Sequence, residues 1–214
     1  CRIVVLISGT GSNLQSIIDH IHDDELPAEV VAVISNRSTA GGLEKAQQAH
    51  IPTQVVDHQQ FSGREAFDAA LMAAIDQHQP DLVVLAGFMR ILTDGFVTHY
   101  TGRMLNIHPS RLPLYKGLNT HQRALDAGDE YHGASVHFVT PDLDGGPVIL
   151  QSELKIHPDH NAATLADDVR EQEHQLYPLV IRWFCQGRVM LQDNIVVKDG
   201  EKLETPLQLH EMTL

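Results

Sequence analysis

Residues 2–13 indicate the fold class and read Arg2-Ile3-Val4-Val5-Leu6-Ile7-Ser8-Gly9-Thr10-Gly11-Ser12-Asn13. Its first part is an apolar, β-branched run of the kind that forms a buried strand in a parallel sheet. A glycine-rich turn follows, and a helical pattern begins at residue 13. A strand that passes through such a turn into a helix is typical of the start of a Rossmann-like fold. The stretch therefore predicts an α/β protein.

The same alternation of apolar runs and amphipathic stretches continues through the first half of the chain. Strands alternating with helices predict a parallel sheet with helices on both faces. We expect strands at 2–8, 30–35, 53–57, 81–86 and 103–106, and helices at 13–22, 41–49 and 62–78.

The pattern changes after residue 130. Residues 133–139 and 148–154 alternate with period two and are joined by a Pro/Gly/Asp loop, which predicts an antiparallel extension of the sheet. Helical spacing predicts a long amphipathic helix at about 162–184. In the tail, Asp199-Gly200 between two short strand-like runs indicates a hairpin. With no linker and no internal repeat, we expect one domain over residues 1–214.

Composition limits the classes of partner. The chain has 15 Lys and Arg against 28 Asp and Glu, a net charge of −13, and a field of that sign repels nucleic acid and anionic membranes. Two cysteines, Cys1 and Cys185, cannot make a disulfide framework and suit a reducing compartment. The opening apolar run is too short for a signal segment or a membrane span. We expect a cytoplasmic protein that binds small molecules.

The glycine-rich turn at residues 8–13 is a candidate phosphate site. Free backbone N–H groups and the helix dipole favour an anion there, and Ser12 and Asn13 can add donors. It is a poor dinucleotide fingerprint, because Leu14 occupies the third glycine's position and Asn36 stands where an acidic residue would bind ribose. A turn that binds nothing is an equally compatible interpretation.

A second candidate is the segment Asn106-Ile107-His108-Pro109-Ser110, at the carboxyl end of an expected strand. Strand alternation points Asn106 and His108 to the same side. An amide donor and an imidazole so placed can both reach one carbonyl oxygen, which indicates oxyanion chemistry. The plain alternative is a structural histidine, since the chain holds 14 of them.

A third candidate is the turn-forming run Asp142-Leu143-Asp144-Gly145-Gly146-Pro147. A carboxylate at Asp144 beside His108 would orient the imidazole and favour its protonated form, making it a proton donor. A turn without function is again the plain alternative. The stretch His157-Pro158-Asp159-His160 lacks the further ligands of a metal site, so we expect no metal.

Taken together and in this order, residues 8–13, residues 106–110 and the run from Gly133 to Pro147 closely resemble the folate-dependent formyltransferases. The resemblance covers essentially the whole chain and is greatest to the branch that acts on glycinamide ribonucleotide. It implies transfer of a formyl group from 10-formyltetrahydrofolate, as co-substrate, to the amine of glycinamide ribonucleotide in de novo purine biosynthesis. It also implies a monomer or homodimer, with a phosphate-binding half at 1–100 and a catalytic and folate-binding half at 101–214.

The resemblance also implies roles for individual residues. The catalytic residues are Asn106, His108 and Asp144. Glycinamide ribonucleotide is held by Gly11, Ser12, Asn13, Arg170, Glu171, Gln172 and Glu173. The folate is held by Arg64, Met89, Arg90, Ile91, Leu92, Asn106, Thr140, Pro141, Asp142, Leu143 and Asp144. Without the resemblance, Arg64 and Glu173 would be solvated helix charges, and Met89 and Leu92 would be core.

The sequence departs from the family pattern at Arg111, Leu114 and Asn119, and the role of position 119 is therefore in question. Three other activities compete. A methionyl-tRNA formyltransferase needs a further carboxyl-terminal domain and a surface that tolerates a polyanion. A formyltetrahydrofolate hydrolase has an added amino-terminal domain and a residue other than proline at position 109. A binding module without chemistry would not be expected to keep all three catalytic residues.

Overall fold

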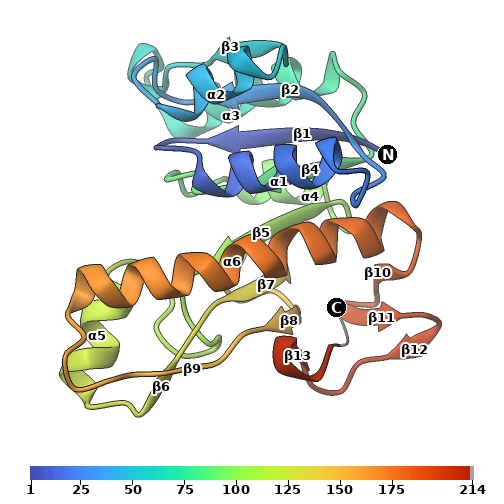
Figure 1. Cartoon of the computed structure of the whole chain (residues 1–214). Coiled ribbons are helices and arrows are strands. Elements are labelled where there is room, and N and C mark those ends of the chain that lie inside the picture. Colours follow the sequence, from blue (N-terminus) through green and yellow to red (C-terminus); the bar gives the residue numbers. More distant parts are fainter. Residues whose placement is uncertain (213–214) are drawn as a thin grey trace. The chain divides into compact units, whose positions relative to one another are not determined.

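The computed structural model describes residues 1–212 and forms two compact units, Cys1–Asn106 and Ile107–Leu214 (Figure 1). The boundary falls inside strand β5 (Met104–His108), so each unit contains part of that strand. Each unit is described by itself.

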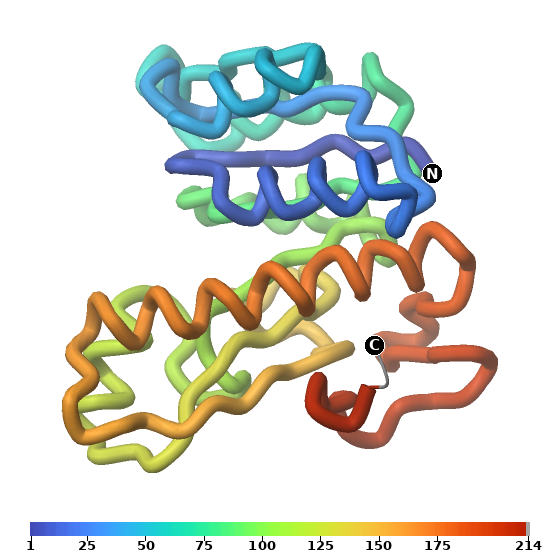
Figure 2. The backbone as a smooth tube through the Cα atoms, in the orientation of Figure 1, coloured from blue at the N-terminus to red at the C-terminus, as the bar shows by residue number. Residues whose placement is uncertain are grey.

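Unit 1 is a parallel sheet with helices on both faces, as the alternating pattern predicts (Figures 1 and 2). The strand order is β5-β4-β1-β2-β3, and every neighbouring pair is parallel. The strands are β1 (Arg2–Ile7), β2 (Glu29–Ser35), β3 (Thr53–Val55), β4 (Leu82–Leu85) and β5. The helices are α1 (Ser12–His22), α2 (Gly42–Gln48), α3 (Arg64–Asp76) and α4 (Asp94–His99), with a short 3-10 turn η1 (His58–Gln60).

The apolar character of the central strands explains why they lie in the middle of this sheet. Residues 3–7 of β1 have no exposed surface, because α1 packs with α2 and α3 packs with α4 over the sheet. Strands covered on both faces have continuous apolar sequences rather than alternating ones. The short helix α4 was not predicted. Its six residues make fewer than two turns, and its clearest signal is the Thr93 cap, whose Oγ1 accepts the Phe96 amide.

Unit 2 confirms the antiparallel extension. The strand order is β13-β8-β7-β5, in which β7 and β8 are antiparallel and β13 runs parallel to β8. The strands are β7 (Ser135–Phe138), β8 (Val148–Gln151) and β13 (Leu207–Gln208), with a separate small ladder of β6 (Tyr131–His132) and β9 (Leu154–Lys155). Helix α5 (Thr120–Ala127), which was not predicted, packs on the long helix α6 (Ala162–Cys185).

Helix α6 lies over β7 and β8 and begins and ends within one residue of the expected range. Asn161 caps its start, accepting from the Ala163 and Thr164 amides, and the Thr164 side chain completes a capping box. Residues one or two turns apart, such as Leu165, Val169 and Leu176, are fully buried. The helix therefore holds its apolar stripe against the sheet.

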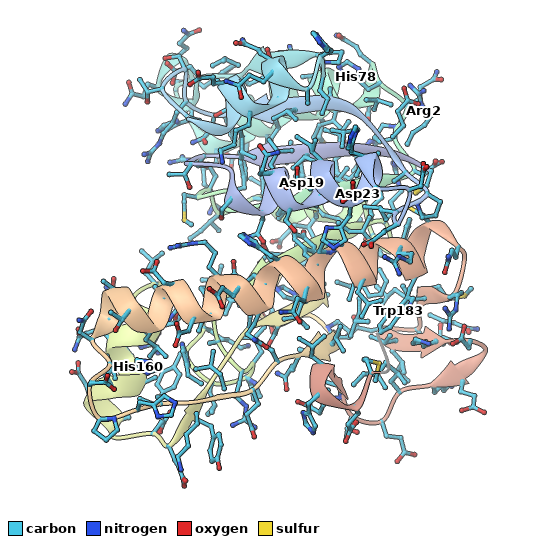
Figure 3. The ribbon with its side chains drawn as sticks, in the orientation of Figure 1. Arg2, Asp19, Asp23, His78, His160 and Trp183 are labelled. Atoms are coloured by element: carbon cyan, nitrogen blue, oxygen red, sulfur yellow. The ribbon has the colours of Figure 1, made fainter. Side chains whose placement is uncertain are left out.

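The tail contains the hairpin expected at Asp199-Gly200 and a second hairpin that turns at residues 193–194. Strands β10 (Val189–Gln192), β11 (Ile195–Lys198) and β12 (Glu201–Lys202) are antiparallel in that order, followed by η2 (Leu209–Glu211). Both two-residue turns have positive φ at each position, as type I′ turns require. The Lys198 ammonium lies 4.6 Å from the ring centroid of Trp183, which Figure 3 labels on α6, so this contact joins the tail to the helix.

The observed fold confirms the predicted class, a mostly parallel sheet flanked by helices with an antiparallel extension. Within residues 1–212, no helix combines the length and the apolar character that a membrane crossing needs. Among the residues that the structure describes, no cysteine thiol is free.

Candidate active site

In unit 1 the expected ligand segments begin where parallel strands end. The Ser8 hydroxyl, just after β1, donates to Asn36 Oδ1 at 2.5 Å and accepts the Met89 amide at 2.8 Å. Asn36 follows β2 and has no exposed surface, and Met89 lies after β4. One serine thus connects the glycine-rich turn with the segment 89–92 at the edge where α/β sheets place their ligands.

The backbone of the glycine-rich turn requires glycine at position 11. Gly11 precedes the first residue of α1 with φ +73°, and a Cβ on it would lie 2.6 Å from Gly42 Cα. Ser12 and Asn13 occupy the first turn of the helix, and the cap residue has no side chain to occupy the helix terminus. The first-turn amides and the helix dipole together favour a small anion at this place.

The segment 89–92 is not buried core. Met89 and Ile91 are each 58% exposed, Leu92 and Arg90 are half-buried, and the Arg90 guanidinium lies 5.9 Å from the ring centroid of Phe67. The alternative of a core role for Met89 is therefore wrong. Arg64, the first residue of α3, is exposed, which fits either a ligand contact or a solvated charge.

Unit 2 brings together two of the three expected catalytic residues. His108, at the end of β5, has its Nδ1 atom 3.4 Å from Oδ2 of Asp144, in the loop between β7 and β8. The two side chains, which we call the buried pair, are only 7% and 9% exposed. Asn106 lies two residues before His108 on β5, and it is half-buried. Water screens the Coulomb interaction between the two groups less here than it would at the surface, because both are buried.

The loop that presents Asp144 has little freedom to change. Asp144 has φ +47°, a left-handed conformation that Asp and Asn tolerate better than most residues. Gly146 has no space for a side chain, because a Cβ would lie 1.8 Å from the Phe138 carbonyl oxygen. The Gly117 amide donates to Asp144 Oδ2 at 2.8 Å. The left-handed turn at Asp144, the close packing of Gly146 and the hydrogen bond from the Gly117 amide together fix the direction of the carboxylate.

The other ring nitrogen of His108 has a defined partner as well. Its Nε2 atom lies 2.9 Å from the carbonyl oxygen of Tyr115. A carbonyl can only accept, so Nε2 carries a hydrogen in this arrangement. Nδ1 is then the ring nitrogen that faces the Asp144 carboxylate.

A second histidine borders Asp144 without competing for this role. His137 Nε2 is 3.9 Å from Asp144 Oδ1, while its Nδ1 donates to the Phe138 carbonyl at 2.9 Å. Burial lowers the pKa of His137, which is 2% exposed, and keeps its ring neutral near pH 7.

The remaining expected ligand residues of unit 2 lie on α6 and on the loop before Asp144. Arg170 is exposed and pairs with Asp167 at 2.7 Å, and Glu173, one turn later on the same face, is buried. Glu171 is exposed and Gln172 half-buried. In the loop, Thr140 is half-buried, and Pro141, Asp142 and Leu143 are exposed.

Two further histidines lie near these groups. His121 Nδ1 is 3.1 Å from His132 Nε2, and His132 also hydrogen-bonds the Pro109 carbonyl. Burial lowers the pKa of the His132 ring to about 4. Burial also lowers the pKa of His121, and the positive charge of Arg170 adds a smaller decrease there. The pair is therefore neutral at pH 7, and the Arg170 charge acts close to it.

The departures from the family pattern have structural explanations. Arg111 forms an ion pair with Glu153 at 2.5 Å, which ties the loop after His108 to the residue before β9. Leu114 is 51% exposed, and its carbonyl accepts from Ser110 Oγ. Asn119 supplies a left-handed residue, φ +57°, before α5 and does not cap that helix with its side chain.

Reasoning from sequence missed the contacts of Ser8, Tyr115 and Gly117. Tyr115 and Gly117 act through a backbone carbonyl and amide, which every residue carries, so no residue type marks them. The glycine at position 117 is a weak sequence signal, because glycine favours the left-handed backbone that the loop adopts there, with φ +79°.

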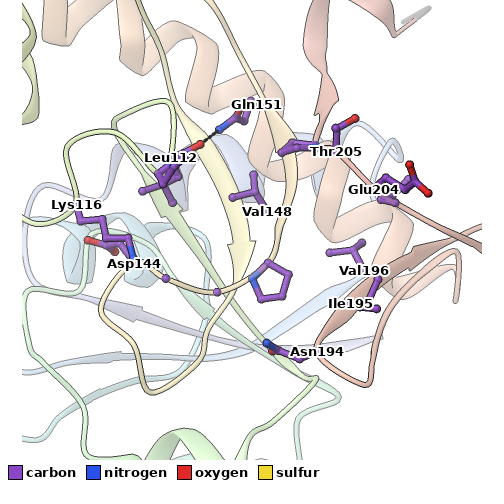
Figure 4. Close-up of a pocket in the computed structure, with 16 residues that line it drawn as sticks. Leu112, Lys116, Asp144, Val148, Gln151, Asn194, Ile195, Val196, Glu204 and Thr205 are labelled. Atoms are coloured by element: carbon purple, nitrogen blue, oxygen red, sulfur yellow. Dashed lines mark hydrogen bonds between the residues drawn. The ribbon is translucent and has the colours of Figure 1, made fainter.

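A pocket of about 390 Å³ borders the same loop within unit 2 (Figure 4). Asp144 and Val148 form part of one wall, Asn194 and Val196 part of another, and Lys116 and Thr205 also line it. The loop that carries Asp144 therefore has open space beside it on this side.

The stretch 157–160 is a loop, as expected. The His157 amide donates to His160 Nδ1 at 3.1 Å, and His160 Nε2 lies 3.0 Å from Asp168. Across residues 1–212, His, Cys, Asp and Glu side chains form no group of three or more placed to hold a metal ion.

Comparison with known proteins gives a consistent result. The formyl transferase family model matches residues 1–181. The phosphoribosylglycinamide formyltransferase of Escherichia coli K12 is 53% identical over 202 residues, 94% of this chain and 95% of that protein, and the Haemophilus influenzae enzyme of the same name is 48% identical over the same shares. A solved phosphoribosylglycinamide formyltransferase from Coxiella burnetii superposes with a TM-score of 0.93 at 52% identity, covering 97% of this chain and 98% of that one.

The matched range includes the glycine-rich turn, strand β5 and the loop that carries Asp144. Identity near one half over almost the full length of both chains leaves no room for a different fold or family. The chain therefore belongs to the formyl transferase family, among the phosphoribosylglycinamide formyltransferases.

Proposed function

We propose that this chain transfers the formyl group of 10-formyltetrahydrofolate to the amine of glycinamide ribonucleotide, giving formylglycinamide ribonucleotide and tetrahydrofolate. The observation that carries the proposal is the buried pair, with His108 Nδ1 3.4 Å from Asp144 Oδ2 at the end of β5. The close relatives that carry the name phosphoribosylglycinamide formyltransferase support the choice of substrates.

The reaction forms one bond and breaks another at the formyl carbon. The amine nitrogen attacks that carbon, and the carbonyl oxygen of the resulting tetrahedral intermediate carries developing negative charge. The positive charge of protonated His108 and a hydrogen bond donated by the Asn106 amide stabilise this oxygen, and such a donor is worth roughly 3 kcal/mol. The bond from carbon to folate nitrogen then breaks, the amine loses a proton, and the folate nitrogen gains one through His108 and water.

Asp144 holds the proton on His108 in this scheme. The Tyr115 carbonyl engages Nε2, so the proton that moves is the one on Nδ1, beside the carboxylate. The loop geometry at Asp144 keeps the carboxylate aligned with Nδ1 of the ring. His137 remains neutral and serves as packing around Asp144.

The substrates are expected on the loops that follow the strands, at the start of α3 and on helix α6. Gly11, Ser12 and Asn13 hold the phosphate of glycinamide ribonucleotide, and residues 170–173 hold the rest of that substrate. Arg64, Asn106, the backbone of 89–92 and the loop 140–144 hold the folate. The exposure of Met89, Ile91 and Leu143, each above 50%, supports an apolar ligand at these segments, because large apolar side chains left in water often mark a binding surface.

Asp, His and Asn side chains suffice for this acyl transfer, and the scheme requires neither metal nor tightly held cofactor. We also propose a cytoplasmic location and a monomeric or homodimeric state.

One assay tests the activity. The full chain is incubated with 10-formyl folate, with and without glycinamide ribonucleotide, and loss of the formyl group is followed. Loss that depends on the amine supports the proposed transfer. Loss without the amine means hydrolysis, and no loss means a binding protein, so either result would overturn the proposal.

A further inference from the structure

The segment Tyr115–Gly117 contacts both members of the buried pair through its backbone. Its first carbonyl accepts from His108 Nε2 at 2.9 Å, and its last amide donates to Asp144 Oδ2 at 2.8 Å. One short segment, which we call the brace, thus touches the imidazole and the carboxylate at once. A shift of the brace would change the orientation of both.

Burial does not hold the brace in place. Tyr115 is half-buried, Lys116 is exposed, and the next residue, Leu118, is 72% exposed. The backbone is left-handed at Tyr115, with φ +53°, and at Gly117, with φ +79°. A bulky residue disfavours that conformation, so specific contacts must maintain it.

Those contacts come from α5 and the turn that follows it. The Tyr115 hydroxyl donates to Asp129 Oδ2 at 2.6 Å, and this bond raises the pKa of the phenol. Arg123 places its guanidinium 5.2 Å from the Tyr115 ring centroid. The same guanidinium donates from Nη1 to the Lys116 carbonyl at 2.7 Å and to the Leu118 carbonyl at 3.2 Å. Arg123 therefore contacts the brace in two ways: its guanidinium lies over the Tyr115 ring, and it donates to the Lys116 backbone carbonyl.

We propose that Tyr115, Arg123 and Asp129 are positioning residues for the formyl transfer, which hold the brace against the buried pair. This inference rests on the proposed function of that pair. None of the three side chains touches the formyl carbon in this scheme, and their effect is transmitted by the Tyr115 carbonyl and the Gly117 amide. The Tyr115 carbonyl also sets the tautomer of His108, because it can accept only from a protonated Nε2.

The test uses three variants of the full chain, Tyr115→Phe, Asp129→Asn and Arg123→Gln. Each removes one anchor and leaves the buried pair intact. We expect kcat to fall roughly tenfold in each, as for a lost charge-assisted hydrogen bond, with the KM of both substrates nearly unchanged. Tyr115→Phe removes the donor of this bond, and Asp129→Asn removes only the charge of its acceptor, so the double variant should lose no more than Tyr115→Phe alone.

Asp126→Asn is the matched control. Asp126 also lies on α5 and accepts a side-chain hydrogen bond, from Gln122 at 2.7 Å, but that bond does not involve the brace. Its kcat should equal that of the wild type. Equal losses in Asp126→Asn and Asp129→Asn would mean a general effect on α5 and would overturn the proposal.

A second measurement does not depend on activity. The ¹⁵N signals of the His108 ring, assigned by comparison with His108→Gln, should show a protonated Nε2 in the wild type and a mixture of tautomers in the three variants. Unchanged ring signals together with unchanged kcat would overturn the proposal. If the wild type proved inactive in formyl transfer, the proposed function would fail, while the ring signals would still decide whether the brace orients His108.

Discussion

Asp144 Oδ2 lies 3.4 Å from His108 Nδ1, with more than nine-tenths of each side chain buried. The two residues are brought together from β5 and from the loop after β7, and the Gly117 amide fixes the carboxylate from a third element. A carboxylate so placed acts on the ring with little screening by water.

The charge of Asp144 is expected to be essential for turnover. Asp144→Asn keeps the size of the side chain and tolerates the left-handed backbone, so it removes little except the charge. We expect kcat to fall about 100-fold or more with little change in KM, because the His108 imidazole loses the buried charge that faces it. Steady-state kinetics check this, and normal turnover in the folded variant would remove Asp144 from the mechanism.

Gly146 is expected to set the shape of the Asp144 loop. In Gly146→Ala the new methyl would meet the Phe138 carbonyl oxygen, so the loop has to move. We expect a loss of about 1–3 kcal/mol in the free energy of unfolding together with a lower kcat. Gly95→Ala, in helix α4 with nothing within 4 Å of the new atom, is the control and should unfold at least as late as the wild type. Equal stability of the two variants in urea would contradict this account.

Gly11 is expected to control the affinity for the phosphate ester. Gly11→Ala places a Cβ 2.6 Å from Gly42 Cα at a positive φ, which displaces the first turn of α1. We expect the KM for glycinamide ribonucleotide to rise about tenfold or more, because the displaced amides no longer meet the anion, while the KM for the folate changes less. Binding of each substrate alone, measured by calorimetry, checks the difference, and an equal loss for both would rule out a separate phosphate site.

The neutral histidines predict a stability that falls in mild acid. The pKa of His132 is about 4 in the fold, against an ordinary value of 6.5, because the ring is buried. The unfolded chain then takes up a proton between these values while the folded chain does not, so stability is complete above about pH 6.5 and declines toward pH 4. Burial of His121 and His137 acts in the same direction.

Denaturant unfolding at pH 7 and pH 4.5 measures this decline. In His132→Asn the decline should be smaller than in the wild type by on the order of 1–3 kcal/mol. An identical pH dependence in both proteins would show that His132 does not titrate as its burial implies.

Part of this protein follows from its sequence. The apolar runs at 2–8 and 81–86 and the amphipathic pattern at about 162–184 have the length and period that identify strands and a helix, and the structure has them at 2–7, 82–85 and 162–185. Short elements such as α4 and the two-residue strand β6 do not, because they are too brief to show a period. Their positions depend on contacts with distant segments.

The fold class could be predicted from the local pattern of apolar runs, and the candidate catalytic residues from the resemblance to the folate-dependent formyltransferases, together with the chemistry of His, Asn and Asp side chains. The folded chain alone shows that His108 and Asp144, 36 positions apart, lie 3.4 Å from each other, and which ring nitrogen faces the carboxylate. Backbone groups of Tyr115 and Gly117 complete that arrangement, and because every residue carries the same carbonyl and amide, their selection depends on the folded path of the chain.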